Sequence, residues 1–304
     1  MNDTEISNIR SKKIKKSNVF IQKSKFELSA QAQKAILFLI SQVKTSDNEF
    51  QVCQFSIGEF CKICGICDSG SNYRELENTV KAIADKYSLW VPINGKEKLV
   101  RWVESAEIDP CNRTIGLRLN KELSEHLLHL SQNFTVYELS RVLAFKSKYS
   151  IRGYELICSI HYHPEETHVH TFTLNELRDR LGVDADAKSY LLYKNFKSRI
   201  LNPVISEINN VSEKMVTFTE IKRGQTVTAL EFTIRTKPEV IRETTLDRPR
   251  RQPATPATAP GKRSTALRQK KPTKGDSGSE FASLADIAKV QGRLTQTETD
   301  IPTN

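Results

Sequence analysis

An internal repeat restricts the fold of this chain more than any other feature of its sequence. FSIGEFCKICGICDSGSNYRELENTVKAI (55–83) aligns without gaps with FTLNELRDRLGVDADAKSYLLYKNFKSRI (172–200). Each copy contains a segment of helical periodicity, a glycine turn and a second helical segment. Six of the 29 aligned pairs are identical: Phe55 and Phe172, Glu59 and Glu176, Gly65 and Gly182, Tyr73 and Tyr190, Asn78 and Asn195, and Ile83 and Ile200. The repeat therefore predicts two units of the same design.

Segments with strand-like character follow each copy, at 88–93, 98–108 and 114–119 after the first and at 214–224 and 229–236 after the second. Asn94-Gly95 is a hairpin signal within the first set. Two helices around a turn, followed by a β-hairpin, make up a helix-turn-helix with a wing. We therefore predict an α+β fold of two tandem winged-helix domains, at 18–135 and 136–237. The first opens with a helix from Ser29, a predicted N-cap.

The charge of the chain lies mainly in two basic blocks. The formal net charge is +10; residues 10–25 hold seven Lys or Arg and no acid, and residues 248–274 hold nine and no acid. Basic proteins of this size often bind polyanions, most commonly nucleic acid. We assign 1–17 to a basic N-terminal arm. Because 238–304 is rich in proline and poor in apolar residues, we predict that it is a disordered basic tail.

Several classes of protein are disfavoured by the sequence. No run of about 18 apolar residues is present, so we expect no membrane span and a cytoplasmic location. Six cysteines, three of them within seven positions, do not resemble a disulfide framework. The motifs of phosphate-binding loops, nucleophile elbows and zinc proteases are missing. We therefore predict a protein that is not an enzyme and needs no cofactor.

A CxxCxxC run at Cys61, Cys64 and Cys67 raises the question of a metal site. An iron–sulfur cluster of the bacterial ferredoxin type would need a fourth ligand at position 71, which is serine. In the repeat alignment the three cysteines stand opposite Arg178, Leu181 and Asp184. This register predicts a buried Cys64, an exposed Cys61 and a Cys67 in the turn, so that the three sulfurs do not converge. We therefore favour a helix that contains cysteines over a metal centre.

A second candidate metal site is the histidine cluster HYHPEETHVH, His161–His170. Histidines on two strands across a turn would suit zinc or nickel, although a polar loop between a helix and a strand is the simpler interpretation. Tyr162 would give a nicking enzyme its nucleophile, which the winged-helix pattern around it disfavours. A metal- or redox-sensing regulator that uses the cysteines or these histidines stays open as the alternative from another class.

The second helical segment of each copy is the candidate DNA reader, because a helix of this kind fits the major groove. At about 100° per residue, Leu192, Phe196 and Ile200 share the predicted core side. The opposite side carries four predicted DNA contacts, which are Tyr190, Tyr193, Lys194 and Lys197; a fifth predicted contact, Lys188, precedes the segment. No acid occurs between Asp186 and Glu207, so this surface suits a groove lined by phosphates.

The equivalent helix of the first copy is less suited to DNA. Its exposed side carries carboxylates, at Glu75, Glu77 and Asp85, which phosphates would repel. Weaker contacts are predicted for Asn72 and Arg74 at the start of this helix.

Four stretches, in this order, resemble the plasmid replication initiators that bind repeated origin sequences called iterons, the Rep_3-type family. They are NVFIQKSKFELSAQAQKAILFLI (18–40), LAFKSKYSIRGYELI (143–157), FTLNELRDRLGV (172–183) and YKNFKSRILNPVISEIN (193–209). The resemblance covers about 18–237, and the basic tail departs from the compact family pattern.

The resemblance implies two winged-helix domains, of which the second reads duplex DNA and the first contributes dimerisation. It implies binding to iterons, opening of the origin and recruitment of the host initiator and helicase. It also implies that a dimer represses the initiator's own gene at an inverted repeat. Among the predicted contacts it supports Lys188, Tyr190, Lys194 and Lys197. A winged-helix transcriptional repressor without a replication role is the alternative within the same chemistry.

Overall fold

The computed structural model describes residues 1–237, except 45, 66–69, 162, 164–165 and 185. Side chains at 70, 72 and 73 are also outside the described part. The predicted tail at 238–304, Cys67 and Tyr162 therefore lie outside the described residues. Everything described belongs to one compact unit, Met1–Arg250. Among the described residues, no helix is long and apolar enough to cross a membrane.

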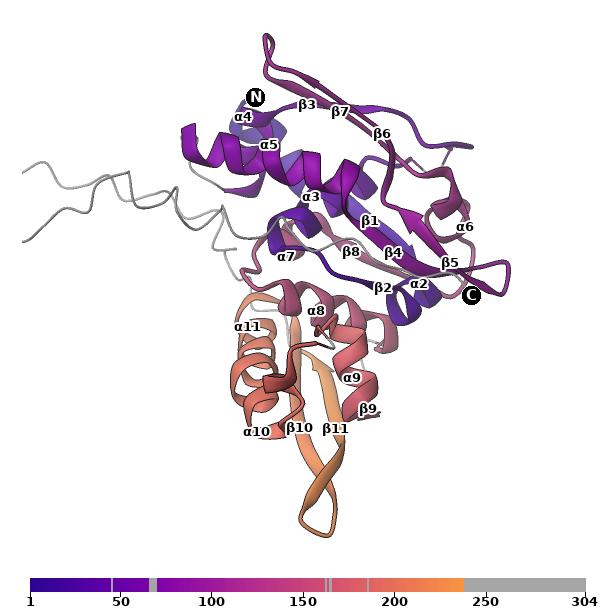
Figure 1. The fold of residues 1–304 in the computed structure, drawn as a ribbon, viewed down its shortest axis with the longest axis vertical. Helices are drawn as coiled ribbons and strands as arrows, with labels where there is room; N and C mark the ends of the chain where they lie inside the picture. The colour runs from indigo at the N-terminus through magenta and orange to yellow at the C-terminus, as the bar shows by residue number, and fades with distance from the viewer. Residues whose placement is uncertain (45, 66–69, 162, 164–165, 185, 238–304) are drawn as a thin grey trace, which may run out of the picture. The chain divides into compact units, whose positions relative to one another are not determined.

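The first domain begins with helix-rich segments and continues with strands (Figure 1). In chain order its elements are α1 (Asp3–Arg10), β1 (Lys13–Ser17), α2 (Asn18–Lys23), β2 (Lys25–Phe26), α3 (Ala30–Ser41), β3 (Cys53–Ser56), α4 (Ile57–Cys64), α5 (Gly70–Asp85), β4 (Ser88–Ile93), β5 (Lys96–Arg101), β6 (Val103–Asp109), β7 (Thr114–Leu119), η1 (Lys121–Leu123), α6 (Ser124–Leu127) and β8 (Phe134–Glu138). The Ser29 side chain accepts from the Ala32 N–H and caps α3, as predicted. Nine of the twelve α3 residues are buried, so α3 forms the centre of this core.

The segment predicted as the second domain follows directly. Its elements are α7 (Leu139–Leu143), α8 (Lys148–Ile160), β9 (His168–Thr173), α9 (Leu174–Leu181), η2 (Lys188–Tyr190), α10 (Tyr193–Phe196), η3 (Lys197–Leu201), α11 (Asn202–Val211), β10 (Lys214–Arg223) and β11 (Thr226–Thr236). The long hairpin β10–β11 extends from the helices at the lower end of the view in Figure 1. Strand β8 spans the boundary between 135 and 136 that the sequence predicted.

The two copies of the repeat begin and end their first helices in the same way. Ser56 and Thr173 each accept a hydrogen bond from the backbone N–H three residues on, and so cap α4 and α9. Both helices end at a glycine in the left-handed conformation, Gly65 at φ 66° and Gly182 at φ 68°. The glycines of the alignment therefore terminate the helix at equivalent positions, as the repeat requires.

The strands repeat as well. In the first domain the order β3-β7-β6 places the last strand of a hairpin beside the strand that precedes α4. In the second domain β9-β11-β10 has the same arrangement around α9. The predicted pair of winged-helix units is therefore present, with the hairpin β4–β5 added to the first unit as part of a separate sheet, β2-β4-β5.

One predicted strand is in fact two. The segment 98–108 divides at Trp102 between β5 and β6, which belong to different sheets. The Trp102 ring is 1% exposed and packs edge-on against Phe20 and Phe26, with ring centres 5.8 and 4.9 Å away. The burial of so large an aromatic side chain against two other rings anchors the corner where the chain passes from one sheet to the other.

The predicted N-terminal arm does not stand apart from the fold. Strand β1 pairs antiparallel with β8, from Lys13 opposite Glu138 to Ser17 opposite Phe134. Its Ile14 and Lys16 are buried, and helix α1 packs against α4. Two of the seven basic residues in 10–25 make contacts within the protein. Lys16 forms a buried ion pair, and Arg10 donates hydrogen bonds to backbone carbonyls of α4. Part of the basic block is therefore structural.

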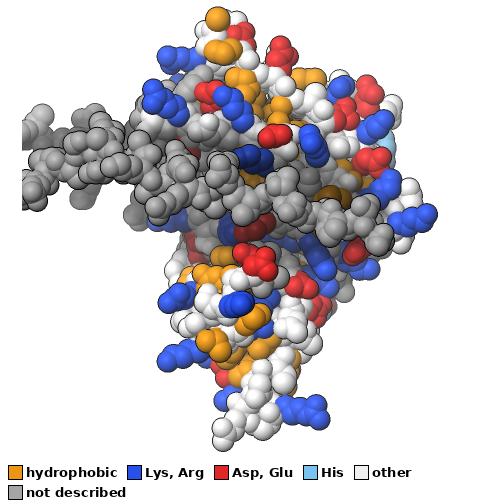
Figure 2. Space-filling view, viewed as in Figure 1, with side chains coloured by type: hydrophobic (Ala, Val, Ile, Leu, Met, Phe, Trp, Pro, Cys, Tyr) orange, Lys and Arg blue, Asp and Glu red, His pale blue; other side chains and the backbone are white. Residues whose placement is uncertain are grey.

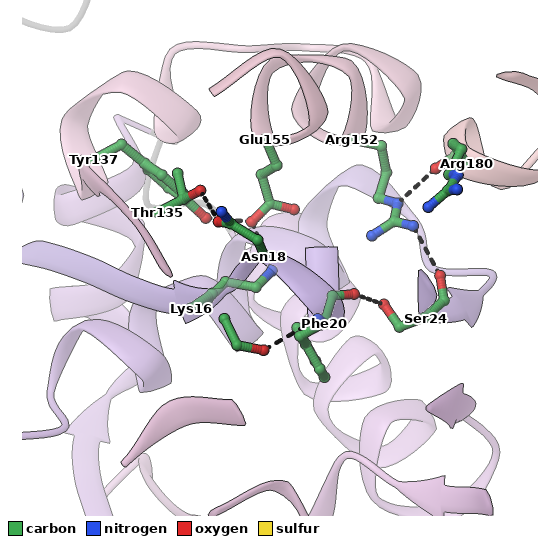
Figure 3. Close-up of polar contacts among 10 residues, drawn as sticks. Lys16, Asn18, Phe20, Ser24, Thr135, Tyr137, Arg152, Glu155 and Arg180 are labelled. Atoms are coloured by element: carbon green, nitrogen blue, oxygen red, sulfur yellow. Dashed lines mark hydrogen bonds and ion pairs between the residues drawn. The ribbon is translucent and has the colours of Figure 1, made fainter. Parts of the chain in front are cut away.

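Helix α8 joins the two domains and is buried on both sides. Toward the second domain, Gly153 lies so close to α11 that an added Cβ would be 2.8 Å from Val204 Cγ1. Toward the first domain, Glu155 accepts a 2.6 Å ion-pair contact from Lys16 Nζ and a hydrogen bond from the Tyr137 hydroxyl (Figure 3). The buried charge of Glu155 is thus compensated by groups from β1 and β8.

A second buried cation, Arg152, completes this joint. Its Nη2 donates to the Ser24 carbonyl at 3.0 Å, and its Nε donates to the Arg180 carbonyl at 3.2 Å (Figure 3). The guanidinium also lies 4.2 Å from the centre of the Phe26 ring. Burial lowers the pKa of Arg152 to about 10. One side chain therefore connects the loop before β2 to the end of α9.

Candidate nucleic-acid interface

The second helix of the second copy is one long helix in three consecutive parts, α10, η3 and α11, which we call the recognition helix (193–211). Its middle part, η3, is a π-helical turn directly before Asn202-Pro203. Proline lacks the N–H of a regular helix and its ring crowds the carbonyl four residues earlier, which a wider turn relieves. The helix begins at Tyr193, so the predicted contacts Lys188 and Tyr190 lie in the turn η2 before it.

The segment before this helix is held in place by hydrogen bonds that its backbone carbonyls accept. Arg178, on α9, donates from Nε to the Tyr190 carbonyl (3.1 Å) and from Nη2 to the Leu191 carbonyl (3.0 Å). Asn195 Nδ2 reaches back to the Ser189 carbonyl at 3.0 Å. The N-terminus of the recognition helix is therefore held in one orientation relative to α9. Sequence reasoning missed both roles, although Asn195 is one of the six identities of the repeat.

The predicted core side is right at two positions and wrong at the third. Phe196 and Ile200 are buried, but Leu192 is 64% exposed. Leu192 is the N-cap residue, in an extended conformation outside the helical turns, so the 100° periodicity does not apply to it. Leu191 beside it is exposed as well.

Of the five DNA contacts predicted in the second copy, two are exposed cations. Lys188 lies in η2 and Lys194 in the first turn of the recognition helix. Tyr190, Tyr193 and Lys197 are partly buried. Arg199, on the next turn, is exposed. Around them Figure 2 shows basic side chains at the surface of this domain and near the end of the β10–β11 hairpin, where Lys222 and Arg223 are exposed.

An acid from the wing meets the predicted contact surface. Glu220, on β10, accepts hydrogen bonds from the Tyr193 hydroxyl at 2.7 Å and from Lys197 Nζ at 2.6 Å. Lys222 Nζ lies 3.6 Å from its other oxygen. The hydrogen bond from Lys197, followed by that from Tyr193, lowers the pKa of Glu220 to about 2. Burial and Glu220 raise the pKa of Tyr193.

Glu220 thus connects the wing to the recognition helix. Lys197 and Tyr193 are engaged within the protein, whereas Lys188 and Lys194 form no ion pair with a described residue. The absence of acids in the sequence between 186 and 207 did not reveal this partner, because Glu220 comes from a different element. One signal could have indicated this contact. Glu220 lies two residues after Phe218 in β10, so the two side chains point to the same inward face of the strand.

The equivalent helix of the first domain is α5. Its Leu76, Val80 and Ile83 are buried and form its core side, and Arg74 is exposed. The side chain of Asn72 lies outside the described residues. Glu77 pairs with Lys81 at 2.6 Å along the helix, while Glu75 and Asp85 are exposed. The acidic surface that the sequence indicated is present on this helix.

The cysteines of α4 lie in the core. Cys64 is buried as predicted, and burial raises the pKa of its thiol to about 12. Cys61, predicted to be exposed, is 1% exposed. The reason is the N-terminal helix, which packs on α4 and whose Arg10 donates to the Lys62 and Ile63 carbonyls at 2.9 Å. The repeat alignment did not predict that Cys61 is buried, because it compares α4 with α9 and includes no segment equivalent to α1.

The histidine cluster is partly structural. His161 is buried, with Nδ1 2.9 Å from Lys214 Nζ and Nε2 2.9 Å from the Glu166 carbonyl. The ammonium can only donate, so both ring nitrogens of His161 are engaged. Burial lowers the pKa of His161. His168 and His170 stack on β9 with ring centres 6.1 Å apart. No group of three or more potential metal ligands occurs among the described residues.

Comparison with known proteins matches both halves of the fold. Residues 13–158 match the family described as Initiator Replication protein, WH1, and residues 173–234 match Initiator Rep protein, WH2. A crystal structure of the Pi initiator protein in complex with iteron DNA is similar to this chain, with a TM-score of 0.63 and 18% identity, covering 76% of this chain and 99% of that one. Domains 2 and 3 of RctB match at a TM-score of 0.39 and 13% identity, covering 68% and 83%. The chain therefore belongs to the initiator replication protein family, with one winged-helix unit in each matched segment.

Proposed function

We propose that this protein is a plasmid replication initiator that binds repeated origin sequences in duplex DNA. The observation that carries the proposal is the start of the recognition helix together with η2 before it, which Arg178 and Asn195 hold in place and where Lys188 and Lys194 are exposed. The N-terminal residues of such helices contact base edges in the major groove. The family and the Pi initiator bound to iteron DNA, which shares the fold, support this assignment.

The wing provides the second part of the proposed interface. Lys222 and Arg223 are exposed at the end of β10, where the hairpin turns at Gly224. Cations at this position would contact phosphates and position the helix without reading sequence. The first domain would contribute less, through Arg74, because Glu75 and Asp85 are exposed on the same helix.

Footprinting on the DNA that flanks the gene tests the proposal. Protection of several direct repeats supports an initiator, whereas protection of a single inverted repeat supports the alternative, a transcriptional repressor. Binding to origin repeats that is no tighter than binding to random duplex at about 150 mM salt would refute both.

Replacement of Lys194 tests the placement of the interface. We expect Lys194→Ala to weaken binding to the footprinted site by about 1–3 kcal/mol if the lysine contacts a base. If it contacts a phosphate, binding to all sequences should weaken together and the salt dependence should fall by about one ion. Lys98→Ala, an exposed lysine of the first domain, is the control. Unchanged binding by Lys194→Ala would place the reading surface elsewhere.

The further steps of initiation belong to the same proposal. They are opening of the origin, recruitment of host initiator and helicase, and repression of its own gene as a dimer, and the family match is the support for them. For self-association, the edge strand β5 offers exposed Leu99 opposite exposed Trp90 on β4. Sedimentation of Leu99→Lys tests this surface, since a charged residue there should shift the population toward the monomer.

The alternative of a metal- or redox-sensing regulator is less well supported. The raised pKa of Cys64 and the lysine on His161 disfavour thiolate or imidazole ligation at these positions. Metal in stoichiometric amount in protein purified without a tag would reinstate it.

A further inference from the structure

Two leucines are exposed at the start of the recognition helix. Leu191 is 60% and Leu192 is 64% exposed, more than any other large apolar side chain among the described residues. Figure 2 shows apolar side chains between Lys and Arg side chains on this domain. An isolated exposed leucine needs no explanation, but an adjacent pair at the end of a recognition helix does.

The fold gives no structural reason for leucine at 192. This residue is the N-cap, where its side chain makes no capping hydrogen bond. Serine, aspartate and asparagine are strongly preferred at such a position, and leucine is among the poorest residues there. Leu192 therefore neither contributes to the core nor stabilises the helix. Positions that break local rules in this way are most often functional.

The pair is also rigidly placed. The Leu191 carbonyl accepts from Arg178, and the Leu192 carbonyl accepts from the Phe196 N–H at 3.0 Å. On either side, Lys188 and Lys194 are exposed and form no ion pair with a described residue. An apolar protein partner would require these ammonium groups to lose water, whereas DNA phosphates would bind them. The flanking charge therefore favours duplex DNA as the occupant.

We propose that Leu191 and Leu192 contact the methyl groups of thymines in the major groove and so help to select the DNA sequence. The thymine methyl is the apolar group that the major groove displays, and it distinguishes thymine by contact with apolar side chains. This inference rests on the proposed function and deepens it, because it assigns a base preference to the two residues directly before the recognition helix.

The test removes single methyl groups from the DNA. A binding site is first selected from random duplexes, and each of its thymines is then replaced by deoxyuridine. We expect wild-type affinity to fall about fourfold at one or two positions, the factor for one buried methyl group. The double variant Leu191→Ser and Leu192→Ser should bind thymine and deoxyuridine equally at these positions.

Thermal unfolding separates this role from a structural one. Because serine is a good N-cap, Leu192→Ser should melt at the same or a higher temperature than wild type while losing the methyl preference. Val169→Thr, which changes another exposed apolar residue of the same domain, should keep the wild-type preference.

Two results would overturn the inference while leaving the proposed function intact. They are a wild-type protein that is indifferent to every deoxyuridine, and a double variant that keeps the wild-type pattern of losses. A selection that enriches no sequence at all would instead overturn the proposed function, and this inference with it.

Discussion

Lys16→Met should be among the most destabilising single changes at the joint between the domains. Lys16 and Glu155 are 1% and 2% exposed and 2.6 Å apart. Removing one partner of a buried ion pair typically costs about 3–5 kcal/mol, because the other charge stays buried. Glu155 keeps the hydrogen bond from Tyr137 and the attraction of Arg152, so we expect a loss near the lower limit, about 3 kcal/mol.

Urea unfolding followed by circular dichroism measures this loss as a change in the midpoint at constant slope. In a thermal scan the same loss corresponds to about 6–12 °C, since about 1 kcal/mol shifts a domain pair of this size by about 2–4 °C. The matched control is Lys98→Met, which removes the exposed pair with Glu122 and should cost less than about 1 kcal/mol.

The double variant Lys16→Met with Glu155→Leu tests the cause. If the cost arises from an uncompensated buried charge, the second change should recover much of the stability lost by the first. A single variant within about 1 kcal/mol of wild type would refute the reasoning. A double variant less stable than Lys16→Met would show that packing, and not charge, determines the effect.

The remaining predictions concern the wing and the helix ends. Glu220→Gln should release Lys197 and steepen the dependence of DNA affinity on salt by about one ion in a titration. Since the folded pKa of Glu220 is about 2 and its ordinary value 4.5, its contribution is complete above pH 4.5 and is lost as pH falls toward 2; wild type should therefore lose more stability than Glu220→Gln in acid unfolding. Gly182→Ala should destabilise more than Gly224→Ala, because both have positive φ but only the added Cβ at 182 meets an atom, the Phe26 carbonyl oxygen at 3.0 Å. Equal melting temperatures for these two alanine variants would contradict this.

Local signals in the sequence identified the features of the fold that depend only on residues close together in the chain. The Ser29 cap of α3, and the glycine turns after α4 and α9, were predicted because capping and left-handed turns act over three or four positions. The apolar periodicity likewise identified Phe196, Ile200 and Cys64 as core residues. Together these signals were sufficient to predict two winged-helix units.

The sequence could not predict contacts between elements far apart in the chain. Helix α1 covers Cys61, Trp102 divides a predicted strand between two sheets, and Glu220 engages Lys197 from the wing. In each case the contacting residues lie tens of residues apart in the sequence, so local periodicity does not predict the contact.

The sequence by itself therefore determined the repeat and its two winged-helix units, and it indicated the helix that we propose reads DNA. Only the tertiary structure decided which side chains at the start of this helix are exposed and which are engaged within the protein. It engages Lys197 and Tyr193, leaves Lys188 and Lys194 free of ion pairs with described residues, and exposes Leu192 at the helix start. The physical reason is that exposure and charge compensation depend on what packs against a residue, which local periodicity does not specify.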